Sequence, residues 1–212
     1  MKRIHLLVLV IVMTVKLFPQ TSFFYSNWEQ QKLAFTSPGA MKYGLYGYDN
    51  PALLSTLTHP DIYITWTKPV NPQFRNDLLG VFTAVPNFGF GFITHKVGNE
   101  SITDYMFTAA FGNKSNSFGI GYGFSNKETF FNVMRNDIFK AGLLIRPAEF
   151  FSLGVTGTQT INNNIREGFV DLAIRPFKDE TLTLFADYTL LYSGKSASSS
   201  FSAGIALEAF PG

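Results

Sequence analysis

From residue 61 onward, apolar and polar residues alternate along the chain with a period of two. This alternation is typical of β-strands whose two faces meet different surroundings, because successive side chains point to opposite sides. In the stretch 118–124, every large side chain falls on one face and glycines occupy the other. No helical period competes with this pattern, so the sequence predicts an all-β chain.

Ten strands follow from the alternation. They are predicted at residues 61–67, 77–85, 87–96, 102–112, 117–125, 136–146, 150–159, 168–175, 181–192 and 200–209. Several approach the nine to eleven residues that a tilted strand needs to cross a membrane. Strands of soluble proteins are usually shorter, so the length of the predicted strands favours a membrane protein.

The connections between these strands fall into two groups. Tight joints are predicted at Pro86, 113–116, Pro147, Pro176 and 211–212, and polar loops at 68–76, 97–101, 126–135, 160–167 and 193–199. Short turns on one side and longer loops on the other are typical of outer-membrane barrels. The sequence therefore predicts an antiparallel transmembrane β-barrel of about ten strands.

A soluble β-sandwich would also alternate, so the two faces of each strand must be compared. In a sandwich the outward face is wet and carries charged and amide side chains. Here the minor face carries Gly, Ala, Ser and Thr with few charges, which suits the inside of a closed barrel. An exported soluble β-sandwich that binds a ligand stays open as an alternative.

Composition removes several classes of function. The net charge of +2 supplies no basic surface for nucleic acid, and the absence of cysteine removes disulfides, thiolate metal sites and cysteine nucleophiles. The sequence contains no G-x-S-x-G, H-E-x-x-H, P-loop or C-x-x-C motif. We therefore expect no enzyme activity, no cofactor and no metal, and we expect His59 and His95 to lie on the surface or in loops.

The N-terminus has the pattern of a signal peptide. Lys2 and Arg3 precede an apolar run at 6–15, which is too short for the roughly 20 residues of a membrane-spanning helix. We assign residues 1–22 to a signal peptide, with cleavage expected between Phe18 and Phe23, and we expect export to the outer membrane.

Residues 23–60, named the hatch here, lack the alternation but are rich in aromatic and apolar side chains, so we expect them to pack against another part of the protein. The motif Asn50-Pro51-Ala52 is followed ten residues later by the aromatic-rich stretch 62–66. In this order the chain resembles the long-chain fatty-acid-transporter-like outer-membrane proteins, which include the PorV-type proteins of Bacteroidetes.

The resemblance implies that Gly39 to Ser55 insert into the lumen as a plug, with Gly39, Asn50, Pro51 and Ala52 as its motif. Room for this plug would come from strands lined by Gly89, Gly91, Gly119, Gly121 and Gly123. The resemblance also implies a Gram-negative, Bacteroidetes-like source and uptake of hydrophobic small molecules. The alternative that it leaves open is a barrel that serves as a membrane platform for secretion partner proteins.

Two features depart from that family. Its barrel has more strands than the ten predicted here, and residues 209–212 read as a corner instead of a final strand. We therefore expect the chain to be the N-terminal part of a longer barrel. The pattern also resembles the barrel-like extension ahead of some signal-peptide-peptidase-A-type proteases, which would make residues 61–212 the anchor of a downstream protease domain.

Charges on the minor face form the one candidate site. They are Asp104, Lys140, Arg146, Asp171, Arg175, Asp187 and Glu208. A charge facing lipid at the bilayer midplane costs about 2–4 kcal/mol, so these side chains are expected in the lumen. They would either fill the lumen as ion pairs and hold the hatch, with Arg146 and Arg175 as the expected contacts, or line a polar path for a solute.

Overall fold

The computed structural model describes residues 24, 30, 33, 44–67, 76–97, 100–130, 133–179, 181–194 and 196–207. The signal peptide expected at 1–22 lies outside these residues. So do Gly39 of the plug motif, Glu208 of the predicted lumen charges and the corner expected at 209–212.

One short helix precedes a series of strands. The elements are η1 (Pro51–Thr56), β1 (Asp61–Thr67), β2 (Asn76–Val85), β3 (Phe88–Val97), β4 (Glu100–Gly112), β5 (Asn116–Ser125), β6 (Thr129–Phe130), β7 (Val133–Met134), β8 (Ile138–Ala148), β9 (Phe151–Thr160), β10 (Ile165–Ile174), β11 (Leu182–Ser193) and β12 (Ala197–Leu207). No helix among the described residues is long and apolar enough to cross a lipid bilayer.

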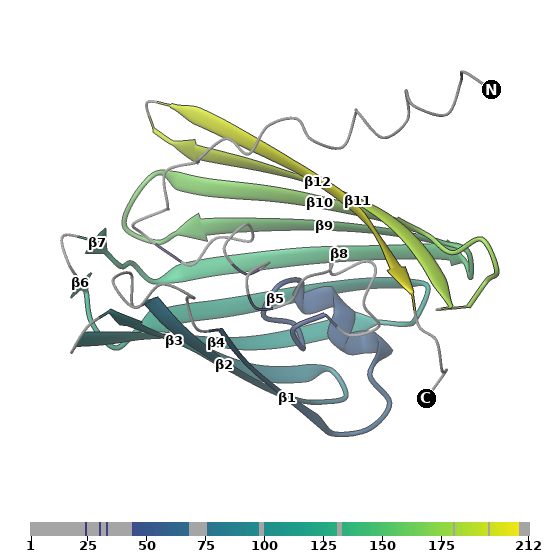
Figure 1. Ribbon diagram of the computed structural model, residues 1–212, viewed down its shortest axis with the longest axis horizontal. Coiled ribbons are helices and arrows are strands. Elements are labelled where there is room, and N and C mark those ends of the chain that lie inside the picture. The colour runs from purple at the N-terminus through teal and green to yellow at the C-terminus, as the bar shows by residue number, and fades with distance from the viewer. Residues whose placement is uncertain are drawn as a thin grey trace, which may run out of the picture.

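Ten of these strands form one antiparallel sheet in the order β1-β2-β3-β4-β5-β8-β9-β10-β11-β12 (Figure 1), and β6 pairs with β7 as a separate hairpin. Each strand of the sheet therefore pairs with the next one along the chain, apart from the β6–β7 excursion. The predicted all-β, ten-stranded antiparallel fold is confirmed. The sandwich alternative is wrong, because a sandwich needs two large sheets and the described residues form one.

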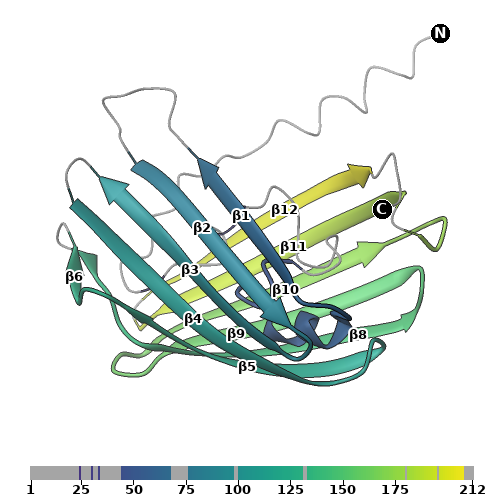
Figure 2. The same cartoon turned by 90° about the horizontal axis from the view of Figure 1, so that it is seen from below.

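The sheet is curled and open. Figure 2 shows its strands wrapping into a trough, with η1 inside the curve. Strands β1 and β12 are the two edges of the sheet and do not pair with each other among the described residues. The ten strands therefore form a curved, barrel-like sheet, and within the described part of the chain its two edge strands have no further strand beside them.

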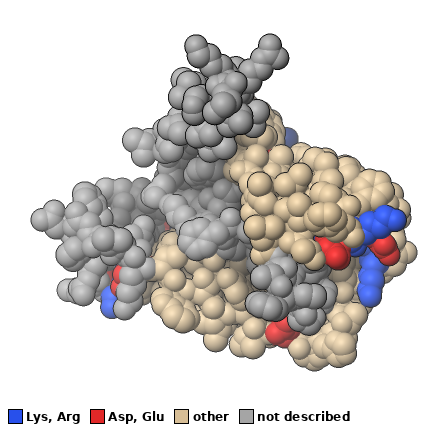
Figure 3. All heavy atoms as spheres, turned by 45° about the vertical axis from the view of Figure 1, so that its right-hand side comes forward, with Lys and Arg blue, Asp and Glu red and all other residues tan. Residues whose placement is uncertain are grey.

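The two faces of this wall differ in the way that the sequence predicts. Along β5, Ser117 and the glycines after it are buried on the concave face, whereas Phe118 and Tyr122 are exposed on the convex face. Aromatic rings on the convex face contact one another from strand to strand. The ring centroids of Phe90 on β3 and Phe107 on β4, for example, lie 4.7 Å apart. Most of the described surface in the view of Figure 3 is formed by uncharged residues.

The predicted contrast between short and long connections is only partly right. We name the end where residues 86–87, 113–115, 149–150 and 175–181 join strands the hatch end, and the opposite end the far end. The connection 98–99 at the far end is short, and 175–181 at the hatch end is longer than a tight turn. The joint expected at Pro147 also moves. Strand β8 continues to Ala148 through a bulge after Ile145, where a proline interrupts no regular ladder bond.

Buried apolar side chains gather on the concave side, between the hatch and strands β2 to β5. Tyr48 and Leu54 of the hatch belong to the same cluster as Phe82 and Met106 of the sheet. The ring of Tyr48 meets the ring of Phe82 edge to face at 5.3 Å. The hatch thus fills part of the trough as a packed core.

Candidate functional site

The hatch enters the trough through a tight loop at residues 44–49. Gly44, Tyr46 and Gly47 adopt left-handed backbone conformations, with φ of 55°, 51° and 84°. The loop closes around the carboxylate of Asp49, which accepts hydrogen bonds from the backbone N–H of Leu45 at 2.9 Å and of Asn50 at 2.8 Å. Gly44 suits this turn because a Cβ there would lie 2.8 Å from Cγ of Asp49.

The Asp49 carboxyl is fully enclosed. Burial raises the pKa of this group, while the two backbone N–H donors and the ammonium group of Lys140 act in the opposite direction. The loop therefore places one buried acidic group of the hatch near Lys140 of strand β8.

The Asn50-Pro51-Ala52 motif has a specific local role. Asn50 is the N-cap of η1, and its Oδ1 accepts a hydrogen bond from the N–H of Ala52 at 3.0 Å. Pro51 occupies the first turn, where its missing N–H costs nothing. The Nδ2 group of Asn50 also donates to the backbone oxygen of Leu143 on β8 at 3.3 Å. One side chain therefore starts the helix and attaches it to the sheet.

Glycines on the concave face let the hatch approach the sheet backbone. A Cβ at Gly89 would lie 2.5 Å from the backbone oxygen of Tyr46, and one at Gly119 would lie 2.5 Å from the backbone nitrogen of Ala52. Gly142 lies directly under Oδ1 of Asn50. On the same floor, Ser117 donates to the backbone oxygen of Ala52 at 2.8 Å.

Not every glycine of the concave face serves the hatch. Gly91 lies under Tyr48, but Gly121 and Gly123 face side chains of neighbouring strands, Met106 and Ile138 among them. Gly142, which the resemblance did not include, gives the hatch room beneath Asn50. The alternation could have identified Gly142, since it shares a strand face with Lys140.

Among the described residues, Lys140 on β8 contacts the hatch through its charged group. Its ammonium group donates to the backbone oxygens of Tyr48 at 2.7 Å and Asp49 at 3.3 Å, and it is 1% exposed. Attraction to the carboxylates of Asp49 and Glu167 accompanies these bonds. The sequence pattern predicts a loop at Glu167, but β10 begins at Ile165 and this side chain is buried on the concave face.

The other predicted lumen charges that the structure describes are distributed along the concave face. Asp171 and Asp187 are buried and face each other across β10 and β11, and Ser202 donates to Asp187 at 3.2 Å. Arg146 donates from Nε to Ser152 at 3.1 Å. Arg175 sits at the hatch end, where its backbone N–H donates to Phe150. Lys140 makes one of the hatch contacts expected of the lumen charges, and hatch contacts of the two arginines stay a prediction.

His95 corrects a further expectation. It is buried on the concave face of β3, and its Nε2 lies 3.6 Å from a carboxylate oxygen of Asp104 on β4. The expectation of a surface or loop position considered only residues near in sequence, whereas the β3–β4 hairpin brings Asp104 beside this strand. His59, by contrast, is exposed.

A groove of about 560 Å³ lies elsewhere, on the convex face. Phe88, Phe107, Tyr122 and Phe139 surround it, and Ala109 is among its lining residues. These side chains belong to the outward set of β3 to β8, so this hollow is separate from the trough that holds the hatch.

The residues on the concave face interact with the hatch through hydrogen bonds and packing. This face holds the hatch through polar contacts, and its buried side chains are mainly apolar on β2 to β5 and mainly polar on β8 to β11. No group of three or more His, Cys, Asp or Glu among the described residues is arranged to hold a metal ion.

Comparison of the chain with protein-family models, with curated proteins and with solved structures gives no match.

Proposed function

We propose that the chain is an exported outer-membrane β-barrel protein of a Gram-negative bacterium, with a hatch-plugged lumen that takes up hydrophobic small molecules. The observation that carries this proposal is the inverted polarity of the sheet. Large apolar side chains are exposed on the convex face, and charged side chains are buried on the concave face.

The convex face is difficult to reconcile with water. Exposed large apolar residues occur along the whole sheet, including Ile64, Phe88, Phe107, Phe118, Phe139, Val155, Val170, Tyr188 and Phe201. Burial of apolar surface contributes roughly 25 cal/mol per Å², and contiguous apolar patches beyond a few hundred Å² mark membrane or protein contacts. Lipid chains would cover this face without requiring a partner for each side chain.

Strand length supports the same conclusion. Strand β9 has 10 residues, which at about 3.3 Å per residue gives ~33 Å. A tilt of about 45° reduces this length to ~23 Å across the membrane, close to the apolar band of about 25 Å around outer-membrane barrels.

The choice of hydrophobic solutes is supported by the apolar part of the concave face. Phe82, Ile93 and Met106 are fully buried there, against the hatch and one another. Movement of the hatch would uncover an apolar wall opposite the polar wall formed by Lys140, Glu167 and their neighbours. A solute with an apolar body and a small polar group fits such a path.

One observation favours a second candidate function, a barrel that stays plugged and acts as a membrane platform for partner proteins. The hatch is attached through buried contacts to β5 and β8, by Ser117, Lys140 and Leu143. A plug fixed in this way would leave the outer rim of the barrel as the functional part.

Two measurements on the expressed full chain test these proposals. Recovery in the outer-membrane fraction with heat-modifiable migration on SDS gels is expected, and recovery as a soluble protein with uniform migration would contradict the membrane assignment. Cells that contain the protein are then expected to accumulate an apolar fluorescent dye faster than cells that lack it. Equal rates, with the protein in the membrane, would favour the platform.

A further inference from the structure

We propose that the groove on the convex face binds one acyl chain of a membrane lipid. This inference rests on the proposed function, because it takes the convex face to meet lipid. It assigns a single hydrocarbon chain to one place on the sheet, at β3 to β8, where the surface is hollowed.

The groove lies where a small side chain interrupts a series of aromatic ones on β4. Among the convex positions of this strand, Ala109 stands between Phe107 and Phe111. Its neighbours in register are Phe88 on β3 and Ile120 on β5, and both line the groove. The missing side chain at Ala109 thus leaves a hollow of about 560 Å³ between large apolar residues.

One wall of the groove is a row of aromatic rings held by their neighbours. Phe90, Phe107, Tyr122 and Phe139 lie beside one another in register on β3, β4, β5 and β8. The rings of Phe90 and Phe107 are in contact, and the hydroxyl group of Tyr122 donates to Asp137 at 2.5 Å. Because these contacts already order the wall, a bound chain loses little affinity to the ordering of side chains.

The chemistry of the groove selects an occupant that is apolar on every side. None of the described residues that line it is charged. The groove opens onto a face that exposes large apolar side chains, so its occupant meets apolar groups both inside the groove and around it. A peptide strand lying there would leave backbone N–H and C=O groups unpaired in an apolar medium. A hydrocarbon chain carries no such groups.

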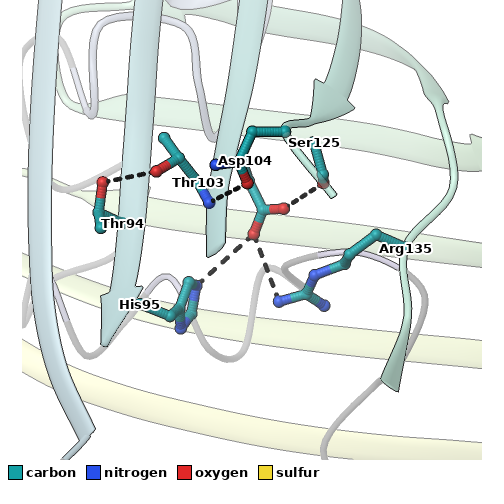
Figure 4. Close-up of polar contacts among 7 residues, drawn as sticks. Thr94, His95, Thr103, Asp104, Ser125 and Arg135 are labelled. Atoms are coloured by element: carbon teal, nitrogen blue, oxygen red, sulfur yellow. Dashed lines mark hydrogen bonds and ion pairs between the residues drawn. The ribbon is translucent and has the colours of Figure 1, made fainter. Parts of the chain in front are cut away.

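The groove belongs to the apolar part of the convex face. On β3 and β4 this part ends toward the far end at Thr94 and Thr103, which are paired in register and hydrogen-bonded through their hydroxyl groups at 3.0 Å (Figure 4). Thr94 lies six residues, or about 20 Å, along β3 from Phe88. A chain in the groove therefore stays clear of these hydroxyl groups.

Small residues continue the groove away from the hatch end. Ile120 pairs with Ala141 on β8, and Ala141 pairs with Gly157 on β9. A Cβ at Gly157 or at its partner Gly168 on β10 would meet nothing within 4 Å. Phe88 begins β3 at the hatch end, whereas Gly157 lies well inside β9. This row of low side chains runs inward from the hatch end, as does an acyl chain whose polar head stays at the membrane surface.

Photocrosslinking of the unchanged full chain tests the site. The protein is placed in phosphatidylethanolamine vesicles that contain a small fraction of phosphatidylcholine with a diazirine in one acyl chain, and crosslinked peptides are mapped by mass spectrometry. Peptides with Phe107 and Tyr122 are expected to carry several-fold more lipid than the peptide with Leu184 and Tyr188, which are similarly exposed on β11.

The outcomes separate this inference from the proposed function. Equal labelling of the two regions would overturn the site while the membrane assignment stands. Weaker labelling at the groove would show that a protein surface covers it, and would also overturn the site. No labelling anywhere on the convex face would contradict the membrane assignment itself.

A matched pair of substitutions fills the groove or a control position. Ala109→Phe places a ring in the hollow and should lower labelling at Phe107 and Tyr122 to the level of β11. Ala186→Phe, at an alanine on the convex face of β11, should leave the excess unchanged. Heat-modifiable migration shows whether each variant has folded, and an excess that persists in folded Ala109→Phe would overturn the proposal. If Ala109→Phe does not fold, the map of the unchanged chain decides.

Discussion

The ammonium group of Lys140 on β8 donates a hydrogen bond of 2.7 Å to the backbone oxygen of Tyr48 in the hatch. The bond lies inside the trough, where both residues are buried. A lysine buried in this way is stabilised only while its hydrogen bonds and its carboxylate neighbours are present. Displacement of the hatch would leave this cation with fewer partners, so the contact favours the plugged state.

Replacement of Lys140 by Met is therefore expected to loosen the hatch. A hydrogen bond to a charged group contributes roughly 1.5–3 kcal/mol, and each 1.4 kcal/mol is about a tenfold change in an equilibrium. The fraction of protein with a displaced hatch should rise about tenfold or more, measured as conductance in planar bilayers. Lys114→Met, at an exposed position in the connection 113–115, is the control and should leave conductance unchanged. Equal conductance in both variants would show that Lys140 does not hold the plug.

Gly119→Ala is expected to push the hatch away from β5. The added Cβ would meet the backbone of η1, 2.5 Å from the nitrogen of Ala52, and rotation of a side chain cannot relieve this contact. Overpacking of this kind costs about 1–3 kcal/mol. Gly157→Ala is the control, since a Cβ at Gly157 has open space around it. Thermal unfolding in detergent and limited proteolysis of the hatch measure the difference. A Gly119→Ala protein as stable and as protease-resistant as the control would refute the close packing.

Asn50→Ala is expected to remove both functions of this side chain. Loss of the N-cap costs about 1 kcal/mol, and the bond to Leu143 is lost with it. Asn50→Ser keeps an acceptor for the N–H of Ala52 but is too short to reach Leu143, so it should fall between Asn50→Ala and the unchanged protein. Protease cleavage rates within the hatch give the order, and an Asn50→Ala protein that resists cleavage like the unchanged chain would contradict it.

The sheet could be predicted from the sequence because the alternation at positions such as 118–124 continues through each strand. The two faces of every strand meet different environments, so apolar and small or polar side chains alternate at successive positions. The positions of the strand ends are predicted less accurately. The sequence predicts a joint at Pro147, but a bulge accommodates this proline inside β8, and it predicts a loop at Glu167, although β10 begins two residues earlier.

The contacts of the candidate site could be predicted only in part. Alternation placed Lys140 and Asp104 on the concave face, because each face repeats every second residue. Their partners come from segments distant in sequence, such as Tyr48 for Lys140 and Arg135 for Asp104. Strand register and the path of the hatch decide these pairings, and neither is encoded in local spacing. His95 was misplaced for the same reason.

The central claim, that the convex face of the sheet meets lipid, is tested most directly by single cysteines at neighbouring positions of β9. The chain contains no native cysteine, so Val155→Cys and Thr156→Cys can each carry one environment-sensitive fluorophore. Val155 is exposed on the convex face, and Thr156 is buried on the concave face. In vesicles of brominated lipid, we predict strong quenching of the label at Val155 and little at Thr156. Absence of quenching at Val155, in protein that has bound to the vesicles and folded, would contradict the account.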